Sequence, residues 1–242
     1  DGFERRASLL PIFLPGGEAA IREPVRTALS VLIDVFGPEK AAALMPPGAH
    51  GKIASGSVLA LCMEKNRGVY SSGMGRLFDA VSSLLGLVFV ADYDGEAAML
   101  LESSAATVCD FRADGTIGFP GDLPVYMLEL GSDGCVDWRK MVVDLVADRD
   151  NGLSVARISA AFHQALARLI LEAAIREDVP VTLLAGGVFQ NRLVIAEALR
   201  LFEKASRRVL PPCRVPPGDG GISLGQAFAA WKEECHVSRR AG

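Results

Sequence analysis

Several signatures of common protein classes are missing from this chain. Its five cysteines are odd in number and never form a CxxC pair, which argues against a disulfide framework or a zinc knuckle and favours a reducing cytoplasm. No apolar run reaches the roughly 18 residues that span a membrane, and no charged-then-apolar leader opens the chain. GxSxG, the P-loop and GxGxxG after a strand are also missing, so serine hydrolases, P-loop kinases and Rossmann enzymes lack their signatures.

A strong charge of one sign is missing as well. The 25 basic and 29 acidic residues give a net charge of −4, so we expect neither nucleic acid nor a membrane surface as a partner, and a small polar ligand is favoured. Half of the 242 residues are hydrophobic, which is enough for a substantial core. The chain opens on Asp1 in place of Met, which indicates part of a longer protein.

The hydrophobic periodicity predicts an α/β chain with a large helical portion. Helices are expected from Glu23 onward, with a break at MPPGAHG (45–51), and 110–138 shows only turns and short strand-like pieces such as 125–130. Further helices are expected at 139–146 and 153–177. The C-terminal part is expected to contain a strand at 181–184, a helix at 192–204, a strand at 208–210 and a helix at 222–234. This order predicts parallel strands with ligands at their carboxyl ends.

The segment VTLLAGGVFQN (181–191) joins a buried-strand pattern to a paired-glycine turn and a polar helix start. Gly186 and Gly187 lack the Cβ that would keep backbone amides away from an anion or a ribose. Gln190 and Asn191 offer amide side chains where the free N–H groups of a helix favour a negative ligand. An ordinary strand-to-helix turn has the same glycines, so these residues alone leave both interpretations open.

The second glycine-rich loop, VPPGDGGISLGQA (215–227), contains one carboxylate, Asp219. Asp219 is either a helix N-cap or a hard oxygen ligand for a divalent metal. Both loops follow predicted parallel strands, so we expect them to be neighbours in one crevice. His50, His163 and His236 have no HxxxH or HExxH spacing, so no catalytic histidine is assigned, and His163 is expected to be a hydrogen-bonded helical residue.

A third candidate surface lies in GMGRLFDA (73–80). Gly75 and Asp79 are four residues apart and share one helix face, where a flat group can lie against the glycine and a ribose diol can donate to the carboxylate. The alternative is a helix-start glycine with a solvated aspartate. Arg22, Arg26 and Arg76 are either phosphate or carbamate contacts or members of surface ion pairs.

Five ordered segments carry a family resemblance. They are LPGGEAAIREP (14–24), SSGMGRLFDAVSSLLGL (71–87), YDGEAAMLLE (93–102), LAGGVFQNRL (184–193) and PPGDGGISLGQA (216–227). Together they resemble the C-terminal, Kae1-like region of the HypF-type carbamoyltransferases of [NiFe]-hydrogenase maturation, over nearly the whole chain. The resemblance implies an actin-like ATPase (ASKHA), RNase H-like α/β lobe at 1–242 with a helical insertion at about 23–106, related to enzymes that make threonylcarbamoyladenosine in tRNA.

The resemblance also implies an activity and a site. In this family a carbamoyl-adenylate, made from carbamoyl phosphate and ATP in a separate domain, donates its carbamoyl group to the C-terminal cysteine of HypE, and that group later becomes cyanide. The ligands implied are therefore ATP or carbamoyl-adenylate and a divalent metal, namely Mg, Fe or Zn, and the location is the cytoplasm. By similarity, Gly75 and Asp79 would hold the ribose, Gly186, Gly187 and Asn191 would line the adenine and ribose side, and Asp219 would be the metal ligand.

The chain departs from the family pattern in ways that leave alternatives open. The family's metal-binding HxxxH histidines come from an N-terminal lobe that we expect to be absent here, together with the acylphosphatase-like, zinc-finger and adenylate-forming domains. We therefore expect no turnover by this chain alone and a sheet edge at residues 3–9. Gly218 replaces the Asn of the family's PPND. The alternatives are a non-catalytic docking lobe for HypE or another maturation protein, and an O-carbamoyltransferase acting on a small-molecule hydroxyl.

Overall fold

The computed structural model describes residues 3–49, 56–63 and 68–240. The N-terminal part consists of β1 (Ser8–Leu9), β2 (Ile12–Leu14), α1 (Ala19–Arg22), α2 (Pro24–Phe36), α3 (Pro38–Leu44), η1 (Pro47–Ala49), α5 (Gly56–Met63), β3 (Val69–Ser71), α6 (Met74–Leu84) and α7 (Glu96–Ala106). Four short strands follow: β4 (Asp110–Phe111), β5 (Ile117–Gly118), β6 (Glu129–Leu130) and β7 (Cys135–Asp137). The C-terminal part consists of α8 (Arg139–Asp150), α9 (Val155–Arg176), β8 (Val181–Leu183), η3 (Gly187–Gln190), α10 (Arg192–Lys204), β9 (Arg208–Leu210), η4 (Asp219–Gly221) and α11 (Ile222–Arg240).

Local signals account for most helix boundaries. Pro24 occupies the first turn of α2, where its missing N–H costs nothing, and Gly37 ends that helix with a φ of 81°. Gly86 follows α6 with a φ of 75°. The predicted helix at 192–204 and strand at 208–210 are confirmed to the residue.

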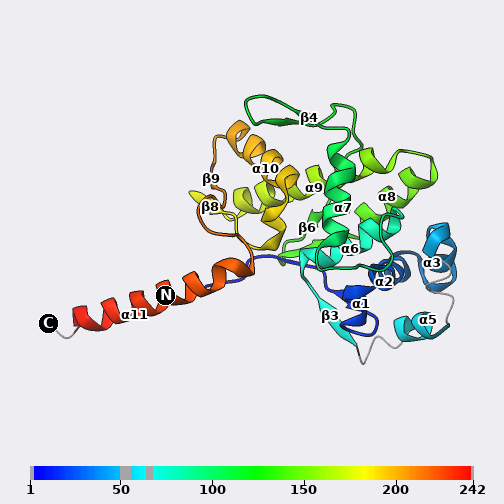
Figure 1. Cartoon of the computed structure of the whole chain (residues 1–242), viewed down its shortest axis with the longest axis horizontal. Helices are drawn as coiled ribbons and strands as arrows, with labels where there is room; N and C mark the ends of the chain where they lie inside the picture. The colour runs from blue at the N-terminus through cyan, green and yellow to red at the C-terminus, as the bar shows by residue number, and fades with distance from the viewer. Residues whose placement is uncertain (1–2, 50–55, 64–67, 241–242) are drawn as a thin grey trace.

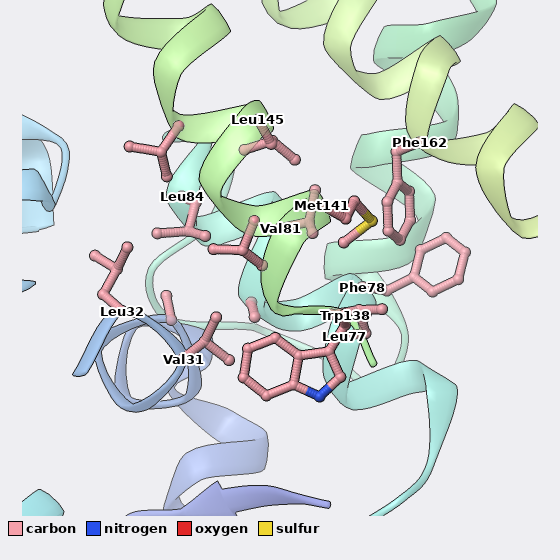
Figure 2. Close-up of a cluster of buried hydrophobic side chains, with 14 of the residues drawn as sticks. Val31, Leu32, Leu77, Phe78, Val81, Leu84, Trp138, Met141, Leu145 and Phe162 are labelled. Carbon is pink, nitrogen blue, oxygen red and sulfur yellow. The ribbon is translucent and has the colours of Figure 1, made fainter. Parts of the chain in front are cut away.

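The core lies among α2, α6, α8 and α9 (Figure 2). Phe78 of α6 meets Phe162 of α9 edge to face, with ring centroids 5.0 Å apart, and Trp138 is fully buried just before α8. By length and composition alone α9 can cross a membrane, but 61% of its most apolar window is buried inside the fold, as in the core helix of a soluble protein. Helices supply most of the core, and strands β1, β2 and β7 add Leu9, Ile12 and Val136 to it. Figure 1 shows how these elements are arranged.

The sheets are small and mixed. β1 pairs in parallel with β7, which pairs antiparallel with β6, so residues 8–9 form an outer strand, as expected for the sheet edge. β8 and β9 form a separate parallel pair with Val181 opposite Arg208, which confirms the parallel order predicted for the C-terminal part. An apolar groove of about 510 Å³ lies between these two sheets and is lined by residues of both β1 and β8.

The burial expected for the strand at 181–184 is wrong. Leu183 is 69% exposed, Val181 and Leu210 are also exposed, and only Leu184 after the strand is buried. The physical reason is that β8 and β9 pair only with each other in the described part of the chain, while α11 extends away from the body (Figure 1). Four large apolar residues in the first half of α11 are also exposed: Ile222, Leu224, Phe228 and Trp231.

Trp138 fixes the start of the chain to the core, which gives a test of the fold. Its indole Nε1–H donates to the carbonyl oxygen of Leu10 over 2.8 Å, between β1 and β2. Replacing Trp138 with Phe leaves this carbonyl without its donor, so we expect a loss of about 1–3 kcal/mol in the free energy of unfolding, measured by urea denaturation. Trp231→Phe is the matched control, because Trp231 is 59% exposed, and we expect a change within about 0.5 kcal/mol. Equal effects in the two variants would contradict the role of the buried bond.

Candidate functional site

The two glycine-rich loops meet at the carboxyl ends of β8 and β9. The N–H of Gly186 donates to the carbonyl oxygen of Pro217 over 2.6 Å. A Cβ placed on Gly218 would lie 3.0 Å from Nε2 of Gln190 and 3.6 Å from the Cα of Gly187. The prediction that these loops are neighbours is confirmed.

Three glycines leave backbone accessible at this place. Gly186 has φ 108° and ψ 161°, a conformation that side-chain-bearing residues rarely adopt. A Cβ on Gly186, Gly187 or Gly75 would meet no atom within 4 Å. The helix that carries Gly75, α6, packs against η3, and Met74 of α6 lines the same groove as Phe189 of η3. The structure thus brings the first turn of α6 beside the loop at 185–191, with open space at both.

Asp79 is buried, which overturns the alternative of a solvated aspartate. Its residue exposure is 6%, and its Oδ2 lies 2.8 Å from Nη1 of Arg76. These two atoms are close but not aligned as a hydrogen bond, so both keep unused hydrogen-bonding capacity. Burial raises the pKa of Asp79 to about 6, the charge of Arg76 opposes this rise, and Asp94 adds to it. A partly desolvated carboxylate with a free acceptor is suited to bind hydroxyl donors.

Asn191 holds the first loop through both ends of its amide. Oδ1 accepts from the N–H of Val194 over 3.0 Å and caps α10, and Nδ2 lies 2.9 Å from Nε2 of His163. His163 donates from Nδ1 to the carbonyl oxygen of Ser159 over 2.7 Å, which leaves Nε2 as an acceptor for the amide. The structure therefore gives Asn191 a positioning role, and its direct contact with a nucleotide stays a prediction.

His163 is a helical histidine with its hydrogen bonds made, as expected. It is fully buried, and burial lowers the pKa of its imidazole to about 4, so the ring is neutral near pH 7. The sequence shows no motif that links His163 to Asn191, since 28 residues separate them. His50 and the side chain of His236 lie outside the described residues.

Asp219 begins η4 and is exposed. Gly218 occupies the N-cap position of this turn without any side-chain cap bond, so the N-cap reading of Asp219 finds no support there. Gly221 is required at its position, because a Cβ would lie 2.6 Å from the carbonyl oxygen of Pro216. Among the side chains that the structure describes, in residues 3–49, 58–63 and 68–232, no three His, Cys, Asp or Glu gather to hold a metal. Asp219 can therefore supply one oxygen ligand of a site that needs others.

Two of the three candidate arginines, Arg26 and Arg76, are engaged in ion pairs. Arg26 lies 2.8 Å from the carboxylate of Glu23 on the same helix, and Arg76 pairs with Asp79 as described. The spacing of Arg76 and Asp79, three residues apart on one helix, is a signal from which this pair can be predicted. The effect of Asp94 on the pKa of Asp79 depends on the turn before α7, and no local pattern in the sequence predicts it.

The fold now defines a class. A parallel strand pair with its loops in one crevice, joined to a large helical portion, is the lobe predicted above, and the class of actin-like, Kae1-like α/β lobes is confirmed by comparison with known proteins. The family model described as "Carbamoyltransferase, Kae1-like Domain, second subdomain" matches residues 1–226. The chain belongs to this carbamoyltransferase family.

Individual relatives agree with the family model. The carbamoyltransferase HypF of Rhodobacter capsulatus is 36% identical over 237 residues, which is 95% of this chain and 28% of that protein. HypF of Synechocystis is 28% identical over 240 residues, or 94% of this chain and 30% of the relative. A HypF homolog of Cupriavidus necator is 30% identical over 235 residues, which is 95% of this chain and 58% of that protein.

Solved structures give the same result in three dimensions. Full-length HypF in a phosphate- and nucleotide-bound form superposes with a TM-score of 0.78 at 29% identity, over 96% of this chain and 29% of that one. HypF of T. kodakarensis gives a TM-score of 0.76 at 26% identity. The chain thus spans about 30% of the length of these two structures, as 29% and 30% of them are covered.

His163 gives a test based on pH. Its pKa is about 4 in the fold against 6.5 for the free side chain, so the unfolded chain binds more protons between these values and stability is lost as pH falls below about 6.5. Between about pH 7.5 and pH 5 this loss is roughly 2 kcal/mol. Asp79 acts in the opposite direction, because its raised pKa makes the fold relatively more stable at low pH.

The measurement is therefore a difference between two proteins. Urea denaturation of the wild type and of His163→Gln at both pH values cancels the contribution of Asp79. We expect the variant to be less stable than the wild type at pH 7.5, because the bonds of His163 are changed, and the gap to narrow by roughly 2 kcal/mol at pH 5. A gap that stays constant with pH would show that His163 is not a buried neutral imidazole.

Proposed function

We propose that this chain is the carbamoyl-transfer lobe of a HypF-type enzyme and that its crevice binds ATP or carbamoyl-adenylate. The observation that carries the proposal is the junction of the loops at Gly186 and Pro217, with open space beside Gly186, Gly187 and Gly75. Asp79, with an unfilled acceptor, would take hydrogen bonds from the ribose hydroxyls. Family membership and the nucleotide-bound form of a structural neighbour support the proposal.

The proposed reaction transfers the carbamoyl group to the thiolate of the C-terminal cysteine of HypE. The sulfur forms a bond to the carbamoyl carbon, the bond from that carbon to the phosphate oxygen breaks, and AMP leaves with the electron pair. This reaction needs no nucleophile from the chain itself. The crevice then contributes by holding the adenylate at a fixed distance and orientation from the thiolate. This positioning accelerates the reaction only if the loops are rigid. The bonds of Asn191 to Val194 and His163 provide that rigidity.

A divalent metal, Mg, Fe or Zn, fits this proposal only if it is bound jointly by Asp219 and by ligands from outside this chain. Asp219 is an exposed carboxylate on the loop that meets Gly186 and Gly187, and it is suited to be one oxygen ligand. The remaining ligands would come from the part of the protein outside this chain. A bound metal would supply electrostatic stabilisation of the phosphate oxygens.

A docking role for HypE is the second candidate, and one observation favours it. The faces of β8 and β9 and the apolar residues of α11 are exposed, which is typical of surfaces that are covered by another protein. In an enzyme lobe the crevice glycines leave space for the nucleotide, so side chains added there weaken nucleotide binding. In a docking lobe the crevice glycines can be filled without loss of affinity for HypE.

Gly187→Val tests the nucleotide crevice. The site of the added side chain is open in this chain, so the fold should tolerate it, but the valine would occupy the space proposed for the nucleotide. We expect the affinity for ATP, titrated calorimetrically with Mg²⁺ present, to fall at least about tenfold. Gly225→Val on the exposed helix α11 is the matched control, since a Cβ there too meets no atom within 4 Å and Gly225 lines neither candidate site.

Two outcomes would contradict the enzyme proposal. One is the absence of nucleotide binding by the chain with Mg²⁺, Fe²⁺ or Zn²⁺, together with no rescue when the N-terminal lobe is added. The other is a normal affinity for ATP in Gly187→Val. Unchanged HypE binding in Asp219→Ala and Asn191→Ala, without any nucleotide binding by the wild type, would favour the docking role.

The raised pKa of Asp79 predicts a pH dependence of nucleotide binding. Above about pH 6 the carboxylate is ionised and accepts hydrogen bonds from the ribose, and below that value it is protonated and a weaker acceptor. We expect the affinity for ATP to fall as pH drops from 7.5 to 5, with a midpoint near 6. In Asp79→Asn the affinity should be lower and lack this midpoint. A wild-type affinity without a step near pH 6 would remove Asp79 from the site.

A further inference from the structure

A second pocket lies beside the β4–β5 hairpin, between α9 and α10. Its volume is about 350 Å³. The segment at 117–121, with Leu123 and Val125, forms one side, and Gln164, Arg168, Arg200 and Arg112 supply the polar groups. The residues predicted to bind the nucleotide or the metal do not line this pocket, so it is separate from the crevice at the two glycine-rich loops.

One buried carboxylate bonds to two of the residues that line this pocket and is already paired. Glu197 of α10 is 1% exposed, and its two oxygens accept from Nε and Nη2 of Arg200, each over 2.7 Å. Nε2 of Gln164 also donates to Glu197, over 3.2 Å. The charge of Glu197 is therefore neutralised by Arg200 and is not available to a second guanidinium.

Arg168 is left with a neutral partner only. Its Nη2 donates to Oε1 of Gln164 over 2.9 Å, and its Nη1 is buried without any hydrogen-bond partner in the part of the chain that the structure describes. Burial of a guanidinium beside an amide costs desolvation free energy, and no carboxylate charge offsets this cost. Such an arrangement is expected where a bound anion completes the pairing.

Arg112, between β4 and β5, adds a second donor to the lining of the pocket. A Cβ on Gly118 would lie 2.7 Å from Nη2 of Arg112, so the guanidinium rests directly against the backbone of β5. Its Nε lies 3.0 Å from Oδ2 of Asp110, an exposed carboxylate that does not line the pocket. The glycine thus makes room for a cation at the wall of the pocket.

We propose that this pocket binds a phosphate group, either as inorganic phosphate or as the phosphate of a small monoester. Glu197 pairs with Arg200 and Asp110 pairs with Arg112, so the guanidinium without a carboxylate partner is that of Arg168, and its charge matches an anion such as phosphate. Guanidinium groups also bind phosphate through paired N–H bonds. The pocket volume accommodates such an anion. This site is independent of the proposed function of the crevice.

Calorimetric titration of the whole chain with inorganic phosphate at low ionic strength tests the site, and methyl phosphate separates a free anion from a monoester. We expect the wild type to bind at least one of the two, and Arg168→Gln to lose at least about tenfold in affinity. Arg112→Gln should also bind more weakly, and because this side chain is 56% exposed the variant should fold even if Arg168→Gln does not. Lys140→Gln, an equal change of charge on α8, is the matched control with unchanged affinity.

The outcomes separate this site from the crevice. Phosphate affinity that survives in Gly187→Val and Asp79→Asn but falls in the two arginine variants supports the pocket, whether or not the crevice binds a nucleotide. Absence of binding by the wild type up to about 10 mM of either anion overturns the proposal. Wild-type affinity in both arginine variants overturns it as well, as does a loss confined to the crevice variants.

Discussion

The burial of α9 is the constraint on which the rest of the structure depends. Phe162 packs into the core against Phe78, and the next residue, His163, receives the amide of Asn191 from the loop after β8. Further along the same helix, Gln164 and Arg168 line the pocket beside the β4–β5 hairpin. A rotation of α9 about its axis would move the core contact, the loop support and the pocket together. The positions of both candidate sites are therefore set by the packing of one helix.

The two buried polar groups near the crevice differ in how completely they are paired. Hydrogen bonds run from the backbone carbonyl of Ser159 through His163 to the amide of Asn191, and they hold the loop in one arrangement. Asp79 and Arg76 lie at ion-pair distance but keep unfilled hydrogen-bonding capacity. Burial of an incompletely paired carboxylate costs free energy in the absence of a ligand, and a bound hydroxyl donor offsets part of that cost. The contrast supports a positioning role for the first group, and it is one reason why we propose ligand contact for Asp79.

Local signals in the sequence predict much of this structure. The glycines at 86 and 186 require backbone angles that favour glycine, and the polar start of α10 made its boundary predictable. The family motifs indicated the class of fold. The exposure of Leu183, the burial of Asp79 and the contact of Arg168 with Gln164 could not be predicted as readily. The first two depend on which distant elements cover a residue, and hydrophobicity along the chain does not carry that information. The third contact is spaced like many solvated helix pairs, and its meaning depends on Glu197, 33 residues beyond Gln164.

The charges of the two candidate sites imply different requirements for binding phosphate. The crevice is associated with the carboxylates of Asp79, Asp94 and Asp219, and its closest arginine is paired with Asp79. Phosphate groups of a nucleotide are repelled by such a surface unless a cation intervenes, so the proposed function includes a divalent metal at Asp219 for an electrostatic reason as well as by resemblance. The pocket beside the β4–β5 hairpin has an excess of guanidinium groups and needs no metal to hold an anion. Phosphate binding that requires a divalent metal is therefore expected in the crevice. Phosphate binding without a metal is expected in the arginine-lined pocket.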